Sequence, residues 1–154
     1  MSKLSHKKIG ICADHGEFEL KEKIVPFLTK NKFEAVDFGA YVLDNADDYP
    51  DFLIPLARAV ADGEVSRGIA ICGSGVGVSI VANKVARVRA ALIQNYFSVH
   101  QGVEDNDMNL LCMGGRTIGY ASVQELVLAF LNAEFIGTER HLQRLQKIQD
   151  LENN

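Results

Sequence analysis

The residues best placed to do chemistry are a cysteine and a serine in a glycine-rich turn. Residues 69–77 read Ile-Ala-Ile-Cys-Gly-Ser-Gly-Val-Gly, so Cys72 ends an apolar run and Ser74 lies in the turn that follows. The apolar run predicts a buried strand, and the spacing of apolar residues after Val76 predicts a helix. A glycine turn between a strand and a helix presents backbone N–H groups that can bind an anion. This stretch therefore predicts an anion site that contains a thiol.

The turn matches neither of two common phosphate motifs. Val78 stands where the dinucleotide-binding fingerprint has its third glycine, and no Gly-Lys-Ser/Thr sequence ends the turn as in a P-loop. A tight turn whose glycines serve packing alone is an alternative, and a cysteine such as Cys72 is often just a buried side chain. A thiol followed at once by a row of backbone amides favours the functional interpretation.

The composition indicates a single globular domain. The chain has 154 residues, of which 47% are hydrophobic and 23% charged, and its net charge is −4. It lacks the basic cluster of a nucleic-acid-binding protein, an apolar run of membrane-spanning length and a signal-peptide core. Its three cysteines do not suit a disulfide framework. We therefore expect one domain over residues 1–154 in a reducing cytoplasm, with no nucleic-acid or membrane partner.

The order of the expected elements explains how these residues would be positioned. Strands are expected over 8–13, 33–38, 68–72, 89–93 and 109–113, and helices over 18–30, 50–62, 76–85, 96–104, 121–133 and 139–150. This alternation predicts an α/β fold with a doubly wound, five-stranded parallel sheet. Ligands bind such sheets beyond the carboxyl ends of the strands. That edge would bring together residues 14–15, 72–77, 93–95 and 114–116.

Other polar residues have both a chemical and an ordinary structural interpretation. Asp14 and His15 follow the first strand and could transfer protons or contact a phosphate, or could cap the next helix and lie exposed. Arg140 and Arg144 lie four residues apart on one helical face, where they could form a phosphate clamp or merely a solvated basic face. Arg116, after the fifth strand, could join such a clamp from another direction.

Together these segments resemble the ribose-5-phosphate isomerase B family, which includes the galactose-6-phosphate isomerase subunits. The resemblance covers roughly residues 8–148. It rests on the ordered motifs Ala13-Asp14-His15, Asp48-Tyr49-Pro50, residues 71–77, Ala82-Asn83-Lys84, Val88-Arg89-Ala90, Asn106-Asp107, Gly114-Gly115-Arg116 and Arg140-His141 with Arg144. It implies a Rossmann-like α/β/α sandwich and a homodimer, or a tetramer, with sites at the subunit interface and the helix over 139–150 packed there. It also implies isomerisation of an aldose phosphate to a ketose phosphate without metal or cofactor. Ribose 5-phosphate, of the pentose phosphate pathway, is the expected substrate.

The resemblance also implies roles for individual residues. Cys72 would be the base that moves a proton between C1 and C2 through an enediolate. Ser74 and the amides of residues 73–77 would stabilise the developing oxyanion. Another branch of the family has a glutamate base where this chain has Val78, so the chain resembles the cysteine branch. The expected substrate-binding residues are Asp14, His15, Tyr49, Gly73, Gly75, Val76, Gly77, Asn106, Arg116, Arg140 and Arg144.

Position 105 departs from the family pattern. Many members have His-Asn-Asp where this chain has Asp105-Asn106-Asp107, and that histidine is assigned to opening the furanose ring. Aspartate has an ordinary pKa near 4, against about 6.5 for histidine. At neutral pH it has normally lost its proton already and is therefore a poorer proton donor. Asp105 could act as a catalytic base on the anomeric hydroxyl, His100 could replace the histidine, or the substrate could need no ring opening. The alternatives are therefore the same chemistry on a tetrose or hexose phosphate, or a non-catalytic sugar-phosphate-binding protein.

Overall fold

A five-stranded parallel sheet forms the centre of the molecule. The structure, a computed structural model, describes residues 7–154. The strands lie in the order β2-β1-β3-β5-β4, and every adjacent pair is parallel. Their bounds are Lys8–Ala13 (β1), Glu34–Asp37 (β2), Arg67–Cys72 (β3), Ala90–Leu92 (β4) and Leu110–Gly114 (β5). The expected α/β class and five-stranded parallel sheet are confirmed.

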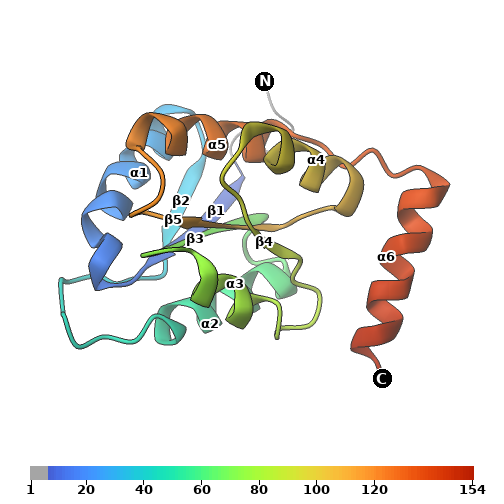
Figure 1. Cartoon of the computed structure of the whole chain (residues 1–154), viewed down its shortest axis with the longest axis horizontal. Helices are drawn as coiled ribbons and strands as arrows, with labels where there is room; N and C mark the ends of the chain where they lie inside the picture. Colours follow the sequence, from blue (N-terminus) through green and yellow to red (C-terminus); the bar gives the residue numbers. More distant parts are fainter. Residues whose placement is uncertain (1–6) are drawn as a thin grey trace.

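Helices cover both faces of the sheet, which makes a three-layer sandwich (Figure 1). Helices α1 (Phe18–Lys30), α4 (Tyr96–Asn106) and α5 (Tyr120–Asn132) lie on one face, and α2 (Pro50–Asp62) and α3 (Val76–Ala82) on the other. A short 3₁₀ helix, η1 (His15–Glu17), precedes α1. The fully buried Ile69 and Ile71 of β3 face the first layer, whereas Ala70 between them faces the second. This alternation gives the sheet two separate hydrophobic cores.

The sheet order places a switch point between β1 and β3. The chain leaves β1 through α1 on one face of the sheet, and it leaves β3 through α3 on the other. The loops that follow the two strands therefore diverge, and a crevice forms between them at the carboxyl edge. Asp14 directly follows β1, and Cys72 is the last residue of β3.

Two buried cations have specific partners. The Lys21 ammonium group is fully buried and lies 2.6 Å from an Asp37 carboxylate oxygen. Arg67 donates hydrogen bonds to the carbonyls of Phe130 and Ala133, at the carboxyl end of α5. Desolvation by burial lowers the pKa of Arg67. Because a buried charge is costly without its partners, these contacts stabilise the packing of α1 and α5 on the sheet.

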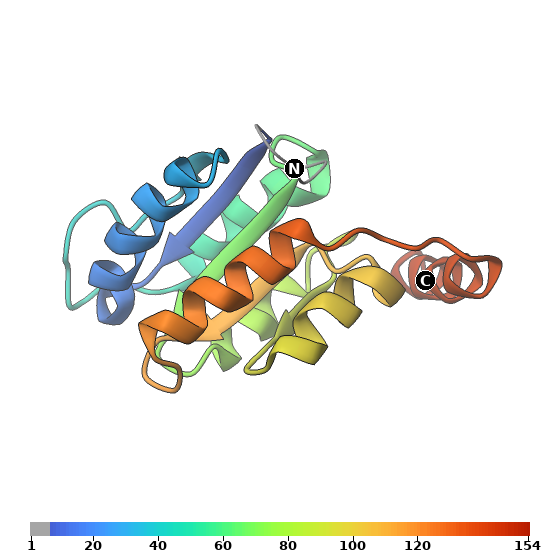
Figure 2. The ribbon, with the colours of Figure 1, turned by 90° about the horizontal axis from the view of Figure 1, so that it is seen from above.

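Helix α6 (Glu139–Glu152) stands apart from the sandwich (Figure 2). None of its residues is buried, and its Leu142, Ile148 and Leu151 are exposed. Its carboxyl end is held to the body by Glu152, whose carboxylate accepts hydrogen bonds from the Arg87 backbone N–H at 3.1 Å. An amphipathic helix of this kind usually has its apolar side covered. The position of α6 therefore leaves apolar surface available for another contact.

The element bounds agree with the sequence expectations at most ends and differ at a few. Helix α3 ends at Ala82 rather than Val85, and β2 and β4 are shorter than expected. The larger difference concerns residues 105–106, which lie beyond the end expected for the helix over 96–104. Asp105 and Asn106 instead lie in the last turn of α4, because the helix ends two residues later than expected, where Asp107 adopts a left-handed conformation with φ of 49°. Among residues 7–154, the structure has no helix long and apolar enough to span a bilayer.

Candidate active site

Strand β3 ends at the crevice with Cys72. The Cys72 residue is 6% exposed, and the glycine turn begins directly after it. Gly75 caps α3 with φ of 82°, and a Cβ there would lie 2.4 Å from Leu92 Cδ1 and 2.8 Å from the Met113 carbonyl carbon. Glycine at this position is therefore required both by the backbone conformation and by space. The N–H of Val76 donates to the Ser74 hydroxyl oxygen at 3.3 Å, which places that hydroxyl beside the start of α3.

The loop after β5 closes against this turn. The N–H of Gly115 donates to the Cys72 carbonyl at 3.0 Å, and the N–H of Arg116 donates to the Gly73 carbonyl at 3.1 Å. The Arg116 side chain crosses the face of Gly73, where a Cβ would lie 3.6 Å from its Cδ. The structure therefore brings the guanidinium group of Arg116 to the turn that follows Cys72.

The loop after β1 supplies a carboxylate and an imidazole. The Asp14 Oδ1 atom is buried and makes no hydrogen bond to any residue of the described chain. His15 Nδ1 lies 2.7 Å from Asp47 Oδ1, and the His15 backbone N–H donates to the same oxygen at 3.2 Å. The hydrogen bond with Asp47 is the main cause of a raised His15 pKa. Asp14 thus offers a free acceptor, while His15 is oriented by a partner that sequence reasoning did not select.

These three loops and the start of α2 enclose one pocket. It has a volume of about 450 Å³ and is lined by Asp14, Tyr49, Cys72, Gly73, Ser74, Gly77, Arg116 and Thr117. Tyr49 reaches it because residue 77 is glycine; a Cβ there would lie 2.6 Å from the Tyr49 ring. We call this space the Cys72 pocket. It gathers seven residues expected from the sequence, with Gly75 and Val76 in the same turn, and adds Thr117, which was not expected.

A second acid lies beside this pocket and was also missed. Glu17, at the end of η1, has a side chain that is only 8% exposed, and its Oε1 lies 4.0 Å from Arg116 Nε. Desolvation is the first cause of its raised pKa; the Asp14 charge raises it further and Arg116 opposes the shift. No sequence signal marks Glu17, because its contact with Arg116 joins residues 99 positions apart.

The remaining expected residues form a separate group at α4 and α6. Asp105 accepts a hydrogen bond from Gln101 Nε2 at 2.8 Å, and its other oxygen lies 3.5 Å from His141 Nε2 on α6. Asn106 lines a different cavity, of about 330 Å³. Arg140 and Arg144 lie on α6, outside the lining of the Cys72 pocket. A single chain therefore does not bring these four residues to Cys72.

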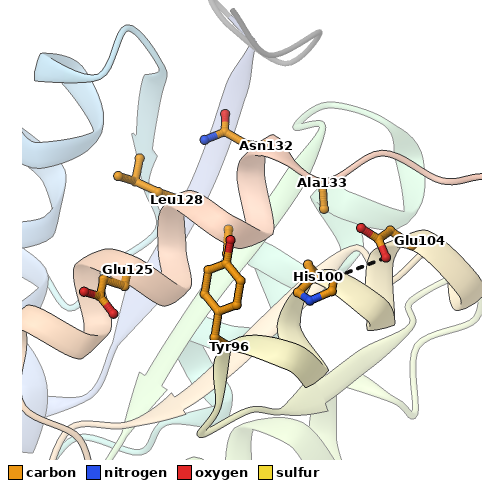
Figure 3. A pocket seen from close by; sticks show the side chains of 8 residues that line it. Tyr96, His100, Glu104, Glu125, Leu128, Asn132 and Ala133 are labelled. Carbon is orange, nitrogen blue, oxygen red and sulfur yellow. Dashed lines mark hydrogen bonds and ion pairs between the residues drawn. The ribbon is translucent and has the colours of Figure 1, made fainter.

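His100, expected as a possible substitute for the ring-opening histidine, lies in yet another place. Its Nδ1 is 3.1 Å from Glu104 Oε2, one helical turn along α4. Figure 3 shows this pair in a pocket between α4 and α5, together with Tyr96, Glu125 and Asn132. This pocket and the Cys72 pocket share no lining residue. Within one chain, His100 thus belongs to a different surface from Cys72.

The other two cysteines lie within the core. Cys12 and Cys112 are buried in the strands on either side of β3, and burial raises the pKa of both thiols. They are therefore protonated at neutral pH and act as small apolar side chains. Among residues 7–154, no cluster of three or more His, Cys, Asp or Glu side chains has the geometry to hold a metal ion.

The fold and the pocket together define a Rossmann-like α/β protein whose ligand site places a thiol beside a glycine turn. Comparison with known proteins narrows this class. Residues 9–148 match the family described as Ribose/Galactose Isomerase. The chain is 40% identical over 146 residues to ribose-5-phosphate isomerase B of Escherichia coli, covering 95% of this chain and 97% of the relative. It is 36% identical over 129 residues to D-erythrulose-4-phosphate isomerase of Pectobacterium atrosepticum, covering 84% and 85%.

A solved structure agrees with these relatives. Ribose-5-phosphate isomerase B of Mycoplasma genitalium, with bound ribulose-5-phosphate, superposes with a TM-score of 0.90 at 36% identity, over 96% of this chain and 97% of that one. The chain therefore belongs to the ribose/galactose isomerase family, and it is an isomerase of sugar phosphates.

Proposed function

We propose that this isomerase interconverts ribose 5-phosphate and ribulose 5-phosphate, with Cys72 as the base. The main support is the Cys72 pocket, which contains a thiol, a hydroxyl, a free carboxylate oxygen and a guanidinium group. The chain that forms this pocket is a member of the ribose/galactose isomerase family. Relatives named ribose-5-phosphate isomerase B support the choice of substrate.

The proton transfer follows from what the pocket offers. The Cys72 thiolate removes the proton from C2 of the open-chain aldose and returns it to C1, while a proton moves from O2 to O1. The intermediate is an enediolate, whose negative charge is stabilised by the Ser74 hydroxyl and the amides of the glycine turn. Asp14 and Tyr49 hold the sugar hydroxyls.

We also propose that two copies of the chain complete each site. Arg140 and Arg144 are the expected phosphate ligands, yet they lie on a helix with no buried residue and with exposed apolar side chains. A homodimer would cover that apolar surface and bring the α6 arginines and Asn106 of one copy to the Cys72 pocket of the other. The phosphate would then be held by Arg116 and His15 of one copy and by both α6 arginines of the second copy.

A subunit-mixing experiment tests this arrangement. Cys72→Ala protein and Arg140→Ala/Arg144→Ala protein are each expected to have little activity, since each lacks one half of every site. After they are unfolded together and refolded, about half of the dimers are mixed, and each mixed dimer has one intact site, so about a quarter of the parent activity should return. Activity no higher than the average of the two variants would show that the site lies within one chain.

A tetrose phosphate is the second candidate substrate. Relatives named D-erythrulose-4-phosphate isomerase are 36% and 37% identical to this chain, and Asp105 replaces the histidine assigned to ring opening. A four-carbon sugar phosphate cannot close to a furanose, so it needs no such histidine. Assays against four-, five- and six-carbon aldose and ketose phosphates decide between the candidates: the highest kcat/KM with ribose 5-phosphate supports the first, and with a tetrose phosphate the second. Cys72→Ala is the blank for each substrate.

A further inference from the structure

The buried acid Glu17 has no part in the proposed proton transfer, yet it lies at the Cys72 pocket. Its Oε2 occupies the space in front of Gly115, where a Cβ would come within 1.8 Å of it. Gly115 is the residue whose N–H donates to the Cys72 carbonyl. The Glu17 carboxyl group is thus packed against the backbone that joins the β3 and β5 loops, and glycine at position 115 is what makes room for it.

Arg116 extends outward from this buried acid. Its side chain is 76% exposed and lies near two glycines: a Cβ on Gly16 would lie 3.6 Å from its Nη2, and one on Gly73 would lie 3.6 Å from its Cδ. The 4.0 Å separation of Arg116 Nε from Glu17 Oε1 is too long for a hydrogen bond, so the two groups interact through their charges. The outer nitrogens remain free to bind an anion.

We propose that Glu17 competes with the phosphate of the substrate for Arg116, and that its charge sets the phosphate affinity of the site. The inference rests on the proposed role of Arg116 in holding phosphate. When a dianion binds the outer face of the guanidinium group, an ionised Glu17 lies behind the same group, 4.0 Å from Arg116 Nε, and repels the dianion. A protonated Glu17 does not. Binding of a dianion therefore draws a proton onto Glu17, and the affinity of the site falls as Glu17 ionises.

The groups that face Glu17 favour such a response. Asp14, at the end of β1, adds a second negative charge, and Arg116, from the β5–α5 loop, is the cation that opposes it. Lys21, one turn further along α1, is already paired with Asp37 and Glu22. His15 also titrates near the pocket, since the hydrogen bond with Asp47 raises its pKa. Its contribution must be separated from that of Glu17, and a comparison of variants over the same pH range does this.

Sulfate is the probe, because it remains a dianion from pH 4.5 to pH 8.5 and so does not add a titration of its own. Its dissociation constant is measured by calorimetry for the parent protein and for Glu17→Gln. At pH 8, Glu17→Gln should bind sulfate about three- to tenfold more tightly, and near pH 4.5 the two proteins should agree within about twofold. His15 acts equally in both proteins, so the ratio of their dissociation constants reports Glu17. Glu17→Asp, which keeps the acid, should retain a pH-dependent affinity.

Glu19→Gln is the matched control, because it removes the same charge from an exposed position two residues along the chain. It should leave the sulfate affinity unchanged at every pH. The proposal is overturned if the ratio of the sulfate dissociation constants of the parent and Glu17→Gln stays constant from pH 4.5 to 8.5. It is also overturned if Glu17→Gln binds sulfate more weakly than the parent at pH 8. Isomerase activity is measured separately: kcat of Glu17→Gln should stay within about twofold of the parent. If the parent isomerises no sugar phosphate, the proposed function fails while the sulfate measurement still decides the role of Glu17.

Discussion

The Cys72 pocket and helix α6 both carry residues expected at the active site, but they are held in very different ways. The pocket is fixed by backbone hydrogen bonds between the loops after β3 and β5, and by glycines at which no larger residue fits. The contacts of helix α6 with the body include two polar ones, Asp105 with His141 and Glu152 with the Arg87 backbone. The Cys72 pocket is lined by residues of a single chain, whereas α6 has apolar side chains that are exposed.

This difference separates two tasks of the proposed enzyme. The proposed proton transfer uses a thiol and oxyanion donors, which must be placed within tenths of an ångström, and loops fixed on parallel strands suit that requirement. Binding a phosphate needs charge from several directions, which a second chain can supply. The contact between Asp105 and His141 ties the end of α4 to α6, so the residues of the second region would reach a partner's pocket as one unit.

The largest effect is expected from the centre of the pocket. Cys72→Ala should lose nearly all kcat, because no other residue that lines the pocket carries a thiol, while KM changes little. Steady-state kinetics with ribose 5-phosphate measure this, and a competitive analogue should still bind. Cys12→Ala is the control, since Cys12 is a core thiol and its variant should keep the parent kcat when folded. A Cys72→Ala enzyme within a few-fold of the parent would remove the thiol from the mechanism.

The second effect tests the α6 side of the comparison. Arg140→Ala and Arg144→Ala should each raise KM for a sugar phosphate about 10- to 150-fold, as expected for a loss of about 1.5–3 kcal/mol from a charged hydrogen bond. The effect on kcat should be smaller. Lys147→Ala removes a cation from the same helix and should change KM by less than twofold. Equal KM values for all three variants and the parent would mean that α6 does not hold the phosphate.

A smaller effect is expected at Asp105, where the two regions would meet. If the family's histidine is needed to open a furanose, Asp105→His should raise kcat/KM for ribose 5-phosphate several-fold, because an imidazole both donates and accepts protons near neutral pH. It should leave a tetrose phosphate nearly unchanged, since that sugar has no furanose to open. Lower activity on ribose 5-phosphate would instead identify Asp105 as a working part of the site.

The sequence predicted helix and strand bounds well where residues at the ends of an element determine them. Helix α2 begins and ends as expected, because Pro50 suits the first helical turn and Gly63 adopts the left-handed conformation that ends it. The strand order could not be predicted, because the pairing of β5 between β3 and β4 depends on contacts distant in the chain. The end of α4 was misplaced because Asp107, which is not a glycine, adopts the left-handed conformation that ends the helix.

Part of the site could be predicted because several of its residues lie at or just after the ends of strands. Cys72 ends a strand, while Asp14 and Arg116 lie one and two residues beyond one, and parallel strands bring their carboxyl ends to one edge. Glu17 and Asp47 were missed because their roles come from contacts with distant residues, Arg116 and His15. Such contacts leave no periodic pattern in the sequence. The separation of α6 from the pocket was equally invisible, since helical spacing shows which face of a helix is apolar but not what covers it.

The smallest effect concerns His15, which lies at the start of η1 and is proposed to bind the same phosphate as the α6 arginines. Asp47 accepts the hydrogen bond of the His15 ring and so raises the pKa of His15. Asp47→Asn removes that charge, so the pKa of His15 should fall, as measured by the pH dependence of its imidazole resonances in NMR spectra. His15 then loses its proton at lower pH, and the rise of KM with pH that this loss causes should move to lower pH as well.

The sign of the stability effect gives an independent check on this pair. Because the folded-state pKa of His15 is raised, the pair stabilises the protein fully below the unfolded-state pKa, and this contribution is lost as pH rises through the folded-state value. Asp47→Asn should therefore lower the melting temperature slightly at acidic pH and less at alkaline pH, whereas Asp44→Asn, in the same loop, should show no such trend. A His15 pKa unchanged in Asp47→Asn would mean that Asp47 only shapes the loop, and His15 would then lose its assigned partner in the phosphate site.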